Sequence, residues 1–254
     1  MLARNRRAIL ERLADGDRVL DVGGWALPFS RADWVLDLLP YATRGRYGYS
    51  DAERASERFT EQTWVQADAC GSEPWPWPDD YFDFAICSQM LEDLRDPLRV
   101  CSELGRVAKA GYIEVPSRLE EQTRWLNGAW AGWNHHRWIC EVRDDQIDFV
   151  PKGSLLDVRR DLCVPHRVWA RAGAEARVQA LWWTDRPVTR ELSFIEKSDH
   201  AAWLRRGVPV RGDTLPSRLV NTAHSVAWFA TRGLDRVLRQ GLSAHRKGGS
   251  RIEC

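Results

Sequence analysis

A short apolar strand that runs directly into two glycines is the feature that most constrains this chain. Residues 19–22 form the expected strand, and Gly23 and Gly24 follow it. A second expected strand, residues 34–37, comes soon afterwards and ends on Asp37. Glycines let the backbone turn sharply and approach a ligand closely, and a carboxylate at the tip of the next strand can accept hydrogen bonds from ribose hydroxyls. The combination is typical of a parallel α/β sheet that forms a pocket for a nucleoside.

Helix and strand patterns alternate from residue 1 to about residue 117. Besides the first two strands, the sequence predicts helices over residues 4–14 and 51–62 and from 97 onward, and strands over 64–68, 82–87 and 112–115. Asp96 and Pro97 supply an N-cap and a first-turn proline for the third helix, and Gly111 is expected to end it. Strands that alternate with helices pair in parallel through right-handed crossovers. The predicted fold class is therefore α/β, a doubly wound, mostly parallel Rossmann-like sheet.

Antiparallel strands are expected to complete the C-terminal edge of this sheet. Residues 137–141 and 146–151 read as one hairpin, and residues 178–184 and 188–195 read as a second that turns at 185–187. A polar helical stretch that contains His166 lies between the two hairpins. A helical C-terminal appendage is expected over residues 217–240, where apolar residues recur at helical spacing.

The ligand of an open parallel sheet binds beyond the carboxyl ends of the strands. Before any family is considered, that rule selects a set of residues at expected strand ends: Gly23, Gly24, Asp37, Asp68, Ala69, Ser88 and Gln89. The alternative for the two aspartates is that they are only polar residues at the ends of strands.

Two later segments carry a family resemblance. Residues 75–92, WPWPDDYFDFAICSQMLE, and residues 110–117, AGYIEVPS, follow the paired glycines in the chain. Together they resemble the first half of a class I S-adenosylmethionine-dependent methyltransferase of the methyltransferase type 11 kind. The resemblance implies S-adenosyl-L-methionine as the cofactor. The resemblance implies that the glycine loop and its leading acid (Asp21, Gly23, Gly24) lie under the methionine part and the sugar, and that Asp37 binds the ribose hydroxyls. It also implies that the adenine is bordered by Asp68 and Ala69, and that the floor near the sulfonium is formed by Ser88 and Gln89.

The glycine loop departs from the pattern of that family. The family loop usually reads Asp-x-Gly-x-Gly-x-Gly, whereas Trp25 and Leu27 occupy the later glycine positions here. Only residues 25–33 separate the first two strands, although a crossover normally takes at least ~10–12 residues. The first helix of this half is therefore expected to shrink to about one turn. S-adenosylmethionine has no phosphate that needs a helix N-terminus, so the shortening counts mainly against an NAD-linked oxidoreductase.

The acceptor side is expected in the aromatic segment 125–138, which holds four of the 14 tryptophans. Tryptophan faces beside polar groups suit a sugar ring, and the alternative is that the tryptophans are ordinary core. His135 and His136 are the candidate catalytic residues, because an imidazole can accept the proton of a hydroxyl acceptor near neutral pH. Neighbouring strand residues point to opposite faces, so one histidine at most would reach the sulfonium, and no metal site is expected.

Composition limits the function classes. The formal net charge of +1 does not favour a nucleic-acid binder, and no stretch approaches the ~20 consecutive apolar residues that span a bilayer. Six scattered cysteines fit reduced thiols in a cytoplasm, which is the expected location. From residue 196 onward the chain has eleven Lys or Arg against five Asp or Glu. That basic segment is expected to pack on the domain or to make a peripheral contact with an acidic surface.

These observations predict three parts: a cofactor-binding core over residues 1–117, a substrate-side completion of the sheet over 118–195, and a basic helical segment over 196–254. The expected activity is transfer of a methyl group from S-adenosylmethionine to a hydroxyl of a sugar or natural product. The acceptor is thus a small molecule or glycan. The alternative is a catalytically degenerate methyltransferase fold that binds partners.

Overall fold

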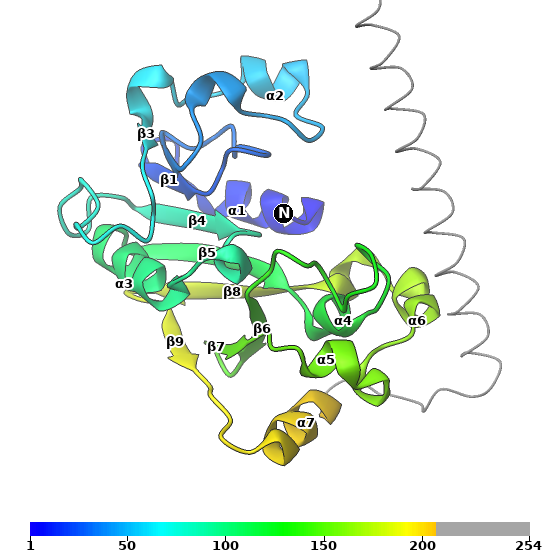
Figure 1. Ribbon diagram of the computed structural model, residues 1–254. Coiled ribbons are helices and arrows are strands. Elements are labelled where there is room, and N and C mark those ends of the chain that lie inside the picture. The colour runs from blue at the N-terminus through cyan, green and yellow to red at the C-terminus, as the bar shows by residue number, and fades with distance from the viewer. Residues whose placement is uncertain (207–254) are drawn as a thin grey trace, which may run out of the picture.

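The computed structural model describes residues 1–206 of the chain (Figure 1). The expected helix over residues 217–240 and most of the basic C-terminal segment lie outside the described residues. Among residues 1–206, no helix has both the length and the apolar character needed to cross a membrane.

The core of the fold is a six-stranded sheet in the order β3-β2-β1-β4-β5-β8. Its strands are β1 (Val19–Val22), β2 (Trp34–Asp37), β3 (Trp64–Gln66), β4 (Phe84–Ser88), β5 (Ala110–Pro116) and β8 (Val178–Thr184). The first five pair in parallel, and β8 pairs antiparallel with β5 at the edge. The prediction of a doubly wound, mostly parallel sheet with an antiparallel edge strand is confirmed.

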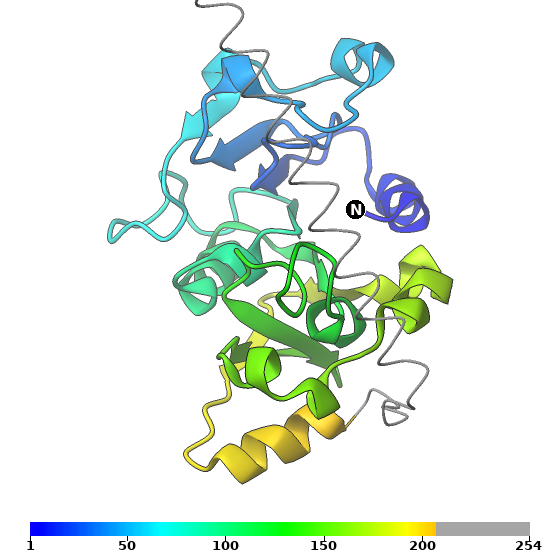
Figure 2. The same cartoon turned by 45° about the vertical axis from the view of Figure 1, so that its right-hand side comes forward.

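A second sheet of three strands lies beside the first, in the order β6-β7-β9. Its strands are β6 (Trp138–Arg143), β7 (Gln146–Pro151) and β9 (Val188–Glu191). β6 and β7 form the expected antiparallel hairpin, which turns through Asp144 and Asp145 at positive φ. Figures 1 and 2 show this sheet and α7 at the end of the molecule opposite β3 and α2.

Helices and short 3-10 turns surround the two sheets. The α-helices are α1 (Ala3–Arg12), α2 (Asp51–Ala55), α3 (Pro97–Val107), α4 (Arg118–Gln122), α5 (Leu155–Val158), α6 (His166–Arg171) and α7 (Lys197–Arg205). The 3-10 turns are η1 (Tyr41–Thr43), η2 (Glu61–Thr63), η3 (Leu91–Asp93), η4 (Arg160–Leu162) and η5 (Ala174–Arg177). Asp96 caps α3 as expected, because its carboxylate accepts a hydrogen bond from the Arg99 amide.

Alternate residues of the central strands supply two cores, one on each face of the main sheet. On one face, Leu20 and Ala85 pack with Leu104 of α3 and with Phe149 of the second sheet. On the other face, the alternate residues of the same strands, whose side chains point the opposite way, pack with Ile9 of α1. A third core joins the second sheet to α5 and α7. Strands β1 and β4 are thus covered on both faces, which is why they read as continuous apolar runs.

Three expected elements differ in the structure. No helix forms between β1 and β2, where residues 25–33 make only turns and bends. The helix expected over 51–62 ends at Ala55, because the segment beyond it turns to bury Phe59 and to pair Glu57 with Arg44. The expected second hairpin is wrong: β8 pairs with β5, and β9 pairs in parallel with β7, so the two strands join different sheets.

Gly111 does not end α3 as expected but lies within β5, where it faces the aromatic ring of Trp183 on β8. A Cβ at this position would overlap both the backbone oxygen of Ala85 and the Trp183 ring. Because the overlapping atoms belong to a strand backbone and a buried ring, neither can move away cheaply.

We therefore expect Gly111→Ala to destabilise the fold by about 1–3 kcal/mol, the cost of overpacking a filled core. Chemical denaturation would measure the change in the free energy of unfolding. Gly16→Ala is the matched control, because a Cβ on Gly16 would meet nothing within 4 Å. Equal stability of the two variants would contradict this account of the β5–β8 contact.

Candidate active site

A cavity of about 360 Å³ lies at the carboxyl ends of β1 and β4. The residues that line it are Met1, Ala3, Arg6, Asp21, Gly23, Gly24, Ala26, Leu27, Pro28, Phe29, Glu53, Ser88 and Gln89. We call it the donor cavity. Of the residues selected from the sequence, it brings together Asp21, both glycines, Ser88 and Gln89.

The glycine loop is shaped by a left-handed backbone at Gly23, whose φ is +80°. Its amide donates to the Leu36 carbonyl of β2 at 2.9 Å, and a Cβ there would overlap the Met90 side chain. Both the dihedral angle and the close approach of Met90 require glycine at this position.

The carboxylate of Asp21 holds the far side of this loop. It is buried, and its Oδ2 accepts a hydrogen bond of 2.8 Å from the amide of Phe29. Burial raises the pKa of Asp21 to about 7, and the hydrogen bond from Phe29 opposes that rise only in part. Asp21 thus bonds directly to the loop backbone that walls the donor cavity.

Asp37 ends β2 as expected, but its carboxylate is used by the backbone around it. Oδ2 accepts from the amide of Trp25 at 2.9 Å, and Oδ1 accepts from the amide of Leu39 at 2.8 Å. The side chain is buried, and that burial raises its pKa. Asp37 is not among the residues that line the donor cavity. The indole of Trp25 donates to Thr43 and meets Tyr47 edge-on, so it packs against the loop after β2.

Like Asp37, the selected residues Asp68 and Ala69 do not line the donor cavity. Asp68 pairs with Arg95 at 2.6 Å, and this partner lowers the pKa of the carboxyl. The Ala69 carbonyl accepts a hydrogen bond from the Trp75 indole. Their visible role is to fasten the loop after β3 to Arg95 and Trp75.

Glu114 is a buried carboxylate that sequence reasoning missed. It lies on β5 behind Ser88 and Gln89, whose side chains donate to its Oε1 at 3.4 and 3.3 Å. Its Oε2 accepts from the hydroxyl of Tyr112 at 2.5 Å. An acid inside the apolar run of residues 110–116 was the signal that could have identified it.

His135 and His136 lie in a turn before β6, not on a strand, so the geometric assumption that their side chains point to opposite faces was wrong. The structure brings both imidazoles to the same carboxylate. The Nε2 atoms of His136 and His135 lie 3.8 and 4.0 Å from Oδ1 of Asp93.

Two further charged residues surround His136. Its Nδ1 lies 2.5 Å from Oε1 of Glu121, a carboxylate on α4 that is completely buried. The other oxygen of Glu121 accepts from Lys152 at 2.6 Å. Asp93, Glu121 and Lys152 were not selected from the sequence, because no local spacing links them to the histidines.

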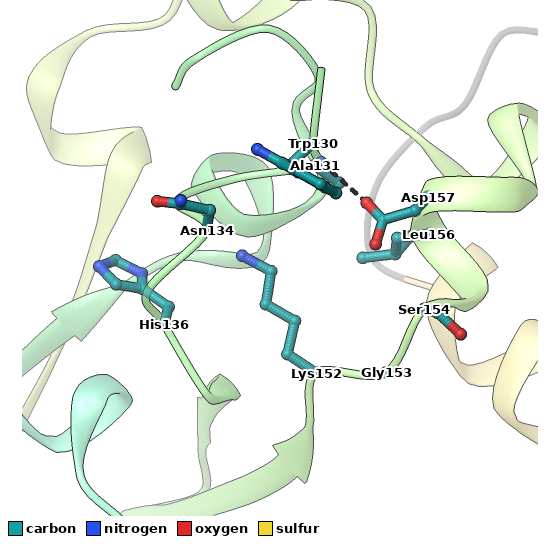
Figure 3. Close-up of a pocket in the computed structure, with 9 residues that line it drawn as sticks. All are labelled: Trp130, Ala131, Asn134, His136, Lys152, Gly153, Ser154, Leu156 and Asp157. Carbon is teal, nitrogen blue, oxygen red and sulfur yellow. Dashed lines mark hydrogen bonds between the residues drawn. The ribbon is translucent and has the colours of Figure 1, made fainter. Parts of the chain in front are cut away.

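A second cavity, of about 320 Å³, opens beside His136 and Lys152. Figure 3 shows Lys152 reaching toward Asn134 and His136, with Trp130 and Asp157 on the opposite wall. Trp130 is 49% exposed, so its ring is available to a ligand. The aromatic segment 125–138 supplies four of the residues that line this cavity, and we call it the aromatic cavity.

A third cavity, of about 260 Å³, adjoins the donor cavity. It shares Met1 and Gln89 with the donor cavity, and it is lined on another side by Trp133 and Glu120. The Trp133 carbonyl accepts from Lys152 at 2.7 Å, so this wall is linked to the lysine that also pairs with Glu121. No residue lines both the donor cavity and the aromatic cavity in the described part of the chain.

One comparison with known protein families matches part of the chain. Residues 47–113 match the family model described as a methyltransferase domain. The match runs from the loop before α2 into β5, so it does not include the glycine loop. No curated protein matches the chain.

Solved structures give weaker likenesses. The cyclase SpnF is 25% identical with a TM-score of 0.33, over 44% of this chain and 43% of that one. A SAM-dependent methyltransferase of Aquifex aeolicus is 19% identical with a TM-score of 0.33, over 45% and 65%. One of Mesorhizobium loti is 19% identical with a TM-score of 0.33, over 57% and 61%. This chain therefore spans less than two thirds of the length of each of these proteins. TM-scores of 0.33 are too low to support a conclusion about this chain.

The raised pKa of Asp21 gives a pH-dependent stability. The carboxyl ionises at about 7 in the folded chain against 3.8 ordinarily, so folding takes up a proton between these values. The contribution of Asp21 is therefore greatest below about pH 4 and is lost as the pH rises through about 7. We expect Asp21→Asn to lose less stability than the wild type between about pH 5 and about pH 8.

Denaturant titrations of both proteins at the two pH values would measure this difference. Asp161→Asn is the control, because Arg159 lowers the pKa of Asp161 to about 2, so that carboxyl stays ionised throughout the window. Parallel pH profiles for the wild type and Asp21→Asn would contradict this prediction, because they would show that burial does not raise the pKa of Asp21.

Proposed function

We propose that the chain is a class I S-adenosylmethionine-dependent methyltransferase and that it methylates a hydroxyl oxygen of a sugar or natural product. The strand order and the match of residues 47–113 to a methyltransferase domain support this proposal. The observation that carries the proposal is the donor cavity. It is built at the carboxyl ends of β1 and β4 from the glycine loop, Ser88 and Gln89, where this sheet topology binds its ligand.

The reaction balances with two reactants and one proton acceptor. A lone pair of the acceptor oxygen attacks the methyl carbon, the bond from that carbon to sulfur breaks, and S-adenosylhomocysteine leaves. The hydroxyl proton passes to a base. Most of the rate enhancement in such a transfer comes from holding the two reactants in line.

His136 is the base in this proposal. The Glu121 carboxylate, paired with Lys152, can only accept, so it fixes the proton of His136 on Nδ1. The lone pair is then on Nε2, as general-base catalysis needs. His136 does not line the donor cavity, so the proposal requires the reacting hydroxyl to lie on the Trp133 side of that cavity, within hydrogen-bond reach of Nε2.

The aromatic cavity suits an acceptor with both apolar and hydroxylated surface. Trp130 offers a flat apolar face, while Asn134, Lys152 and Asp157 offer polar groups on the same walls. Residues 118–195, which supply all these side chains, thus form the substrate side of the molecule in this proposal.

A second candidate function is a methyltransferase fold that binds without catalysis. The observation that favours it is Asp37, because both of its carboxylate oxygens already accept hydrogen bonds from the backbone. Titration calorimetry with S-adenosylmethionine separates the two: the enzyme must bind the donor, whereas a degenerate fold need not.

We expect the protein to bind S-adenosylmethionine in the donor cavity, and Ala26→Trp to abolish binding by filling the cavity that Ala26 lines. Ala14→Trp, at an exposed position outside the cavity, is the matched control and should bind normally. Asp37→Ala should weaken binding by about 1–3 kcal/mol if the carboxylate reaches the ribose. Calorimetry gives each dissociation constant, and thermal melts show whether each variant is folded. Absence of binding to the wild type at millimolar donor would end the methyltransferase proposal.

His136→Ala should reduce turnover by ~10²–10⁴ while leaving the dissociation constant of S-adenosylmethionine nearly unchanged, because a base acts only as the acceptor is methylated. The measurement is formation of S-adenosylhomocysteine against a panel of hydroxylated acceptors. If His136 acts as a base alone, His135→Ala should retain most of the turnover. Near-normal turnover in both variants would remove the histidines from the mechanism.

A further inference from the structure

We propose that Asp93, His135 and His136 bind a divalent first-row transition metal ion, of which Zn²⁺ is the representative. Metal binding at this cluster goes beyond the proposed function and does not depend on methyl transfer, but it replaces the role of His136 as a free base. The three residues offer one carboxylate oxygen and two imidazole nitrogens, all within 4.8 Å of one another. Nitrogen and oxygen ligands of this kind form catalytic zinc sites and the two-histidine, one-carboxylate sites of other transition metals.

The distances fit a bridging ion better than direct hydrogen bonds. Both Nε2 atoms face the same oxygen, Oδ1 of Asp93, at 3.8 and 4.0 Å. A charged hydrogen bond would draw each pair to ~2.7–2.9 Å. A tetrahedral ion with bonds of ~2.1 Å separates its ligands by ~3.4 Å, so each of these two nitrogen–oxygen distances would shorten by about half an ångström around an ion.

The shared oxygen has no other use within the described residues. Oδ1 of Asp93 is shielded from solvent and has no hydrogen-bond partner there. Such a lone acceptor is costly to bury, because it has lost water and gained nothing in exchange. An ion held between Oδ1 and the two imidazoles would satisfy it.

The surroundings of His136 have the form of a metal site's outer shell. A ligating histidine usually donates its second ring nitrogen to a carboxylate, which fixes the orientation of the ring. Here Nδ1 of His136 meets the completely buried Glu121, and Lys152 holds the far oxygen of that carboxylate. Nε2 is thereby aimed at Asp93 with its lone pair exposed to a metal.

The backbone also holds the two ligand segments together. Asp93 ends η3, and the amide of Arg137, next to the histidines, donates to the Glu92 carbonyl at 2.7 Å. The imidazole of His135 and the carboxylate of Asp93 are 56% and 40% exposed, so an ion can reach the site from solvent. Three protein ligands leave at least one coordination position for water or an oxygen of a substrate.

This inference changes the expected role of His136. A metal on Nε2 would occupy the atom that a base needs. The bound ion would instead lower the pKa of a coordinated hydroxyl, whose proton would pass to solvent water. The two roles differ in their demand on His135. A base leaves His135→Ala active, whereas a metal site makes both histidines necessary.

Cobalt titration of the full chain, freed of metal by a chelator, tests the site. Co²⁺ bound to nitrogen and oxygen ligands gives visible absorption bands, so the probe reports coordination without any enzymatic assay. We expect one Co²⁺ per chain, displaced by Zn²⁺. Asp93→Asn and His135→Ala change exposed or half-exposed side chains, and each should weaken Co²⁺ binding by more than ~100-fold, while Glu121→Gln should weaken it by ~10–100-fold.

His166→Ala is the matched control, because it removes a histidine of α6 that is outside the cluster and should leave the affinity for Co²⁺ unchanged. Thermal melts give a second readout: Zn²⁺ should raise the melting temperature of the wild type and of His166→Ala, but not that of Asp93→Asn or His135→Ala. Wild-type affinity for Co²⁺ in both of those variants would overturn the proposal. So would a wild-type protein that gives no Co²⁺ bands at millimolar metal.

Discussion

The parallel pairing of β1 with β4 is the constraint on which the candidate sites depend. In its register Val22 pairs with Cys87, so the next residues of the two strands, Gly23 and Ser88, emerge side by side at the carboxyl edge. Both strands are buried on both faces, and a slip of one residue would turn their apolar side chains to the wrong cores. The packing that fixes the register therefore also fixes the donor cavity.

The missing helix between β1 and β2 explains why two carboxylates are buried there. A loop without regular structure leaves backbone amides that need acceptors. Asp37 accepts from Trp25 at the start of this loop, and Asp21 accepts from Phe29 at its middle. The two carboxylates that the sequence predicts as ligand contacts thus also accept hydrogen bonds from the backbone of this loop. Asp21 is buried in making that contact, and its burial raises the pKa of the carboxyl.

The sheet could be predicted from the sequence because its signals are local: apolar runs, glycines and the Asp96 cap. The prediction of a hairpin over 178–195 was wrong because no local sequence signal indicates that β9 pairs with β7 of the other sheet and not with β8. The candidate site divides in the same way. The glycine loop and Ser88 could be read from strand ends, whereas Glu121, buried far from the histidines in sequence, becomes visible only when α4 packs beside their turn.

The histidine cluster and the donor cavity are two consequences of the same edge of the sheet. β4 continues through Gln89 into η3, which carries Asp93, and β5 continues into α4, which carries Glu121. The hairpin of β6 and β7 then brings the histidine turn and Lys152 to that edge, with the Glu92 carbonyl as its anchor. A chain that builds the donor side from β1 and β4 therefore places a preorganised carboxylate and imidazole group beside it. This shared origin is the physical reason to test the two sites together as parts of one reaction centre.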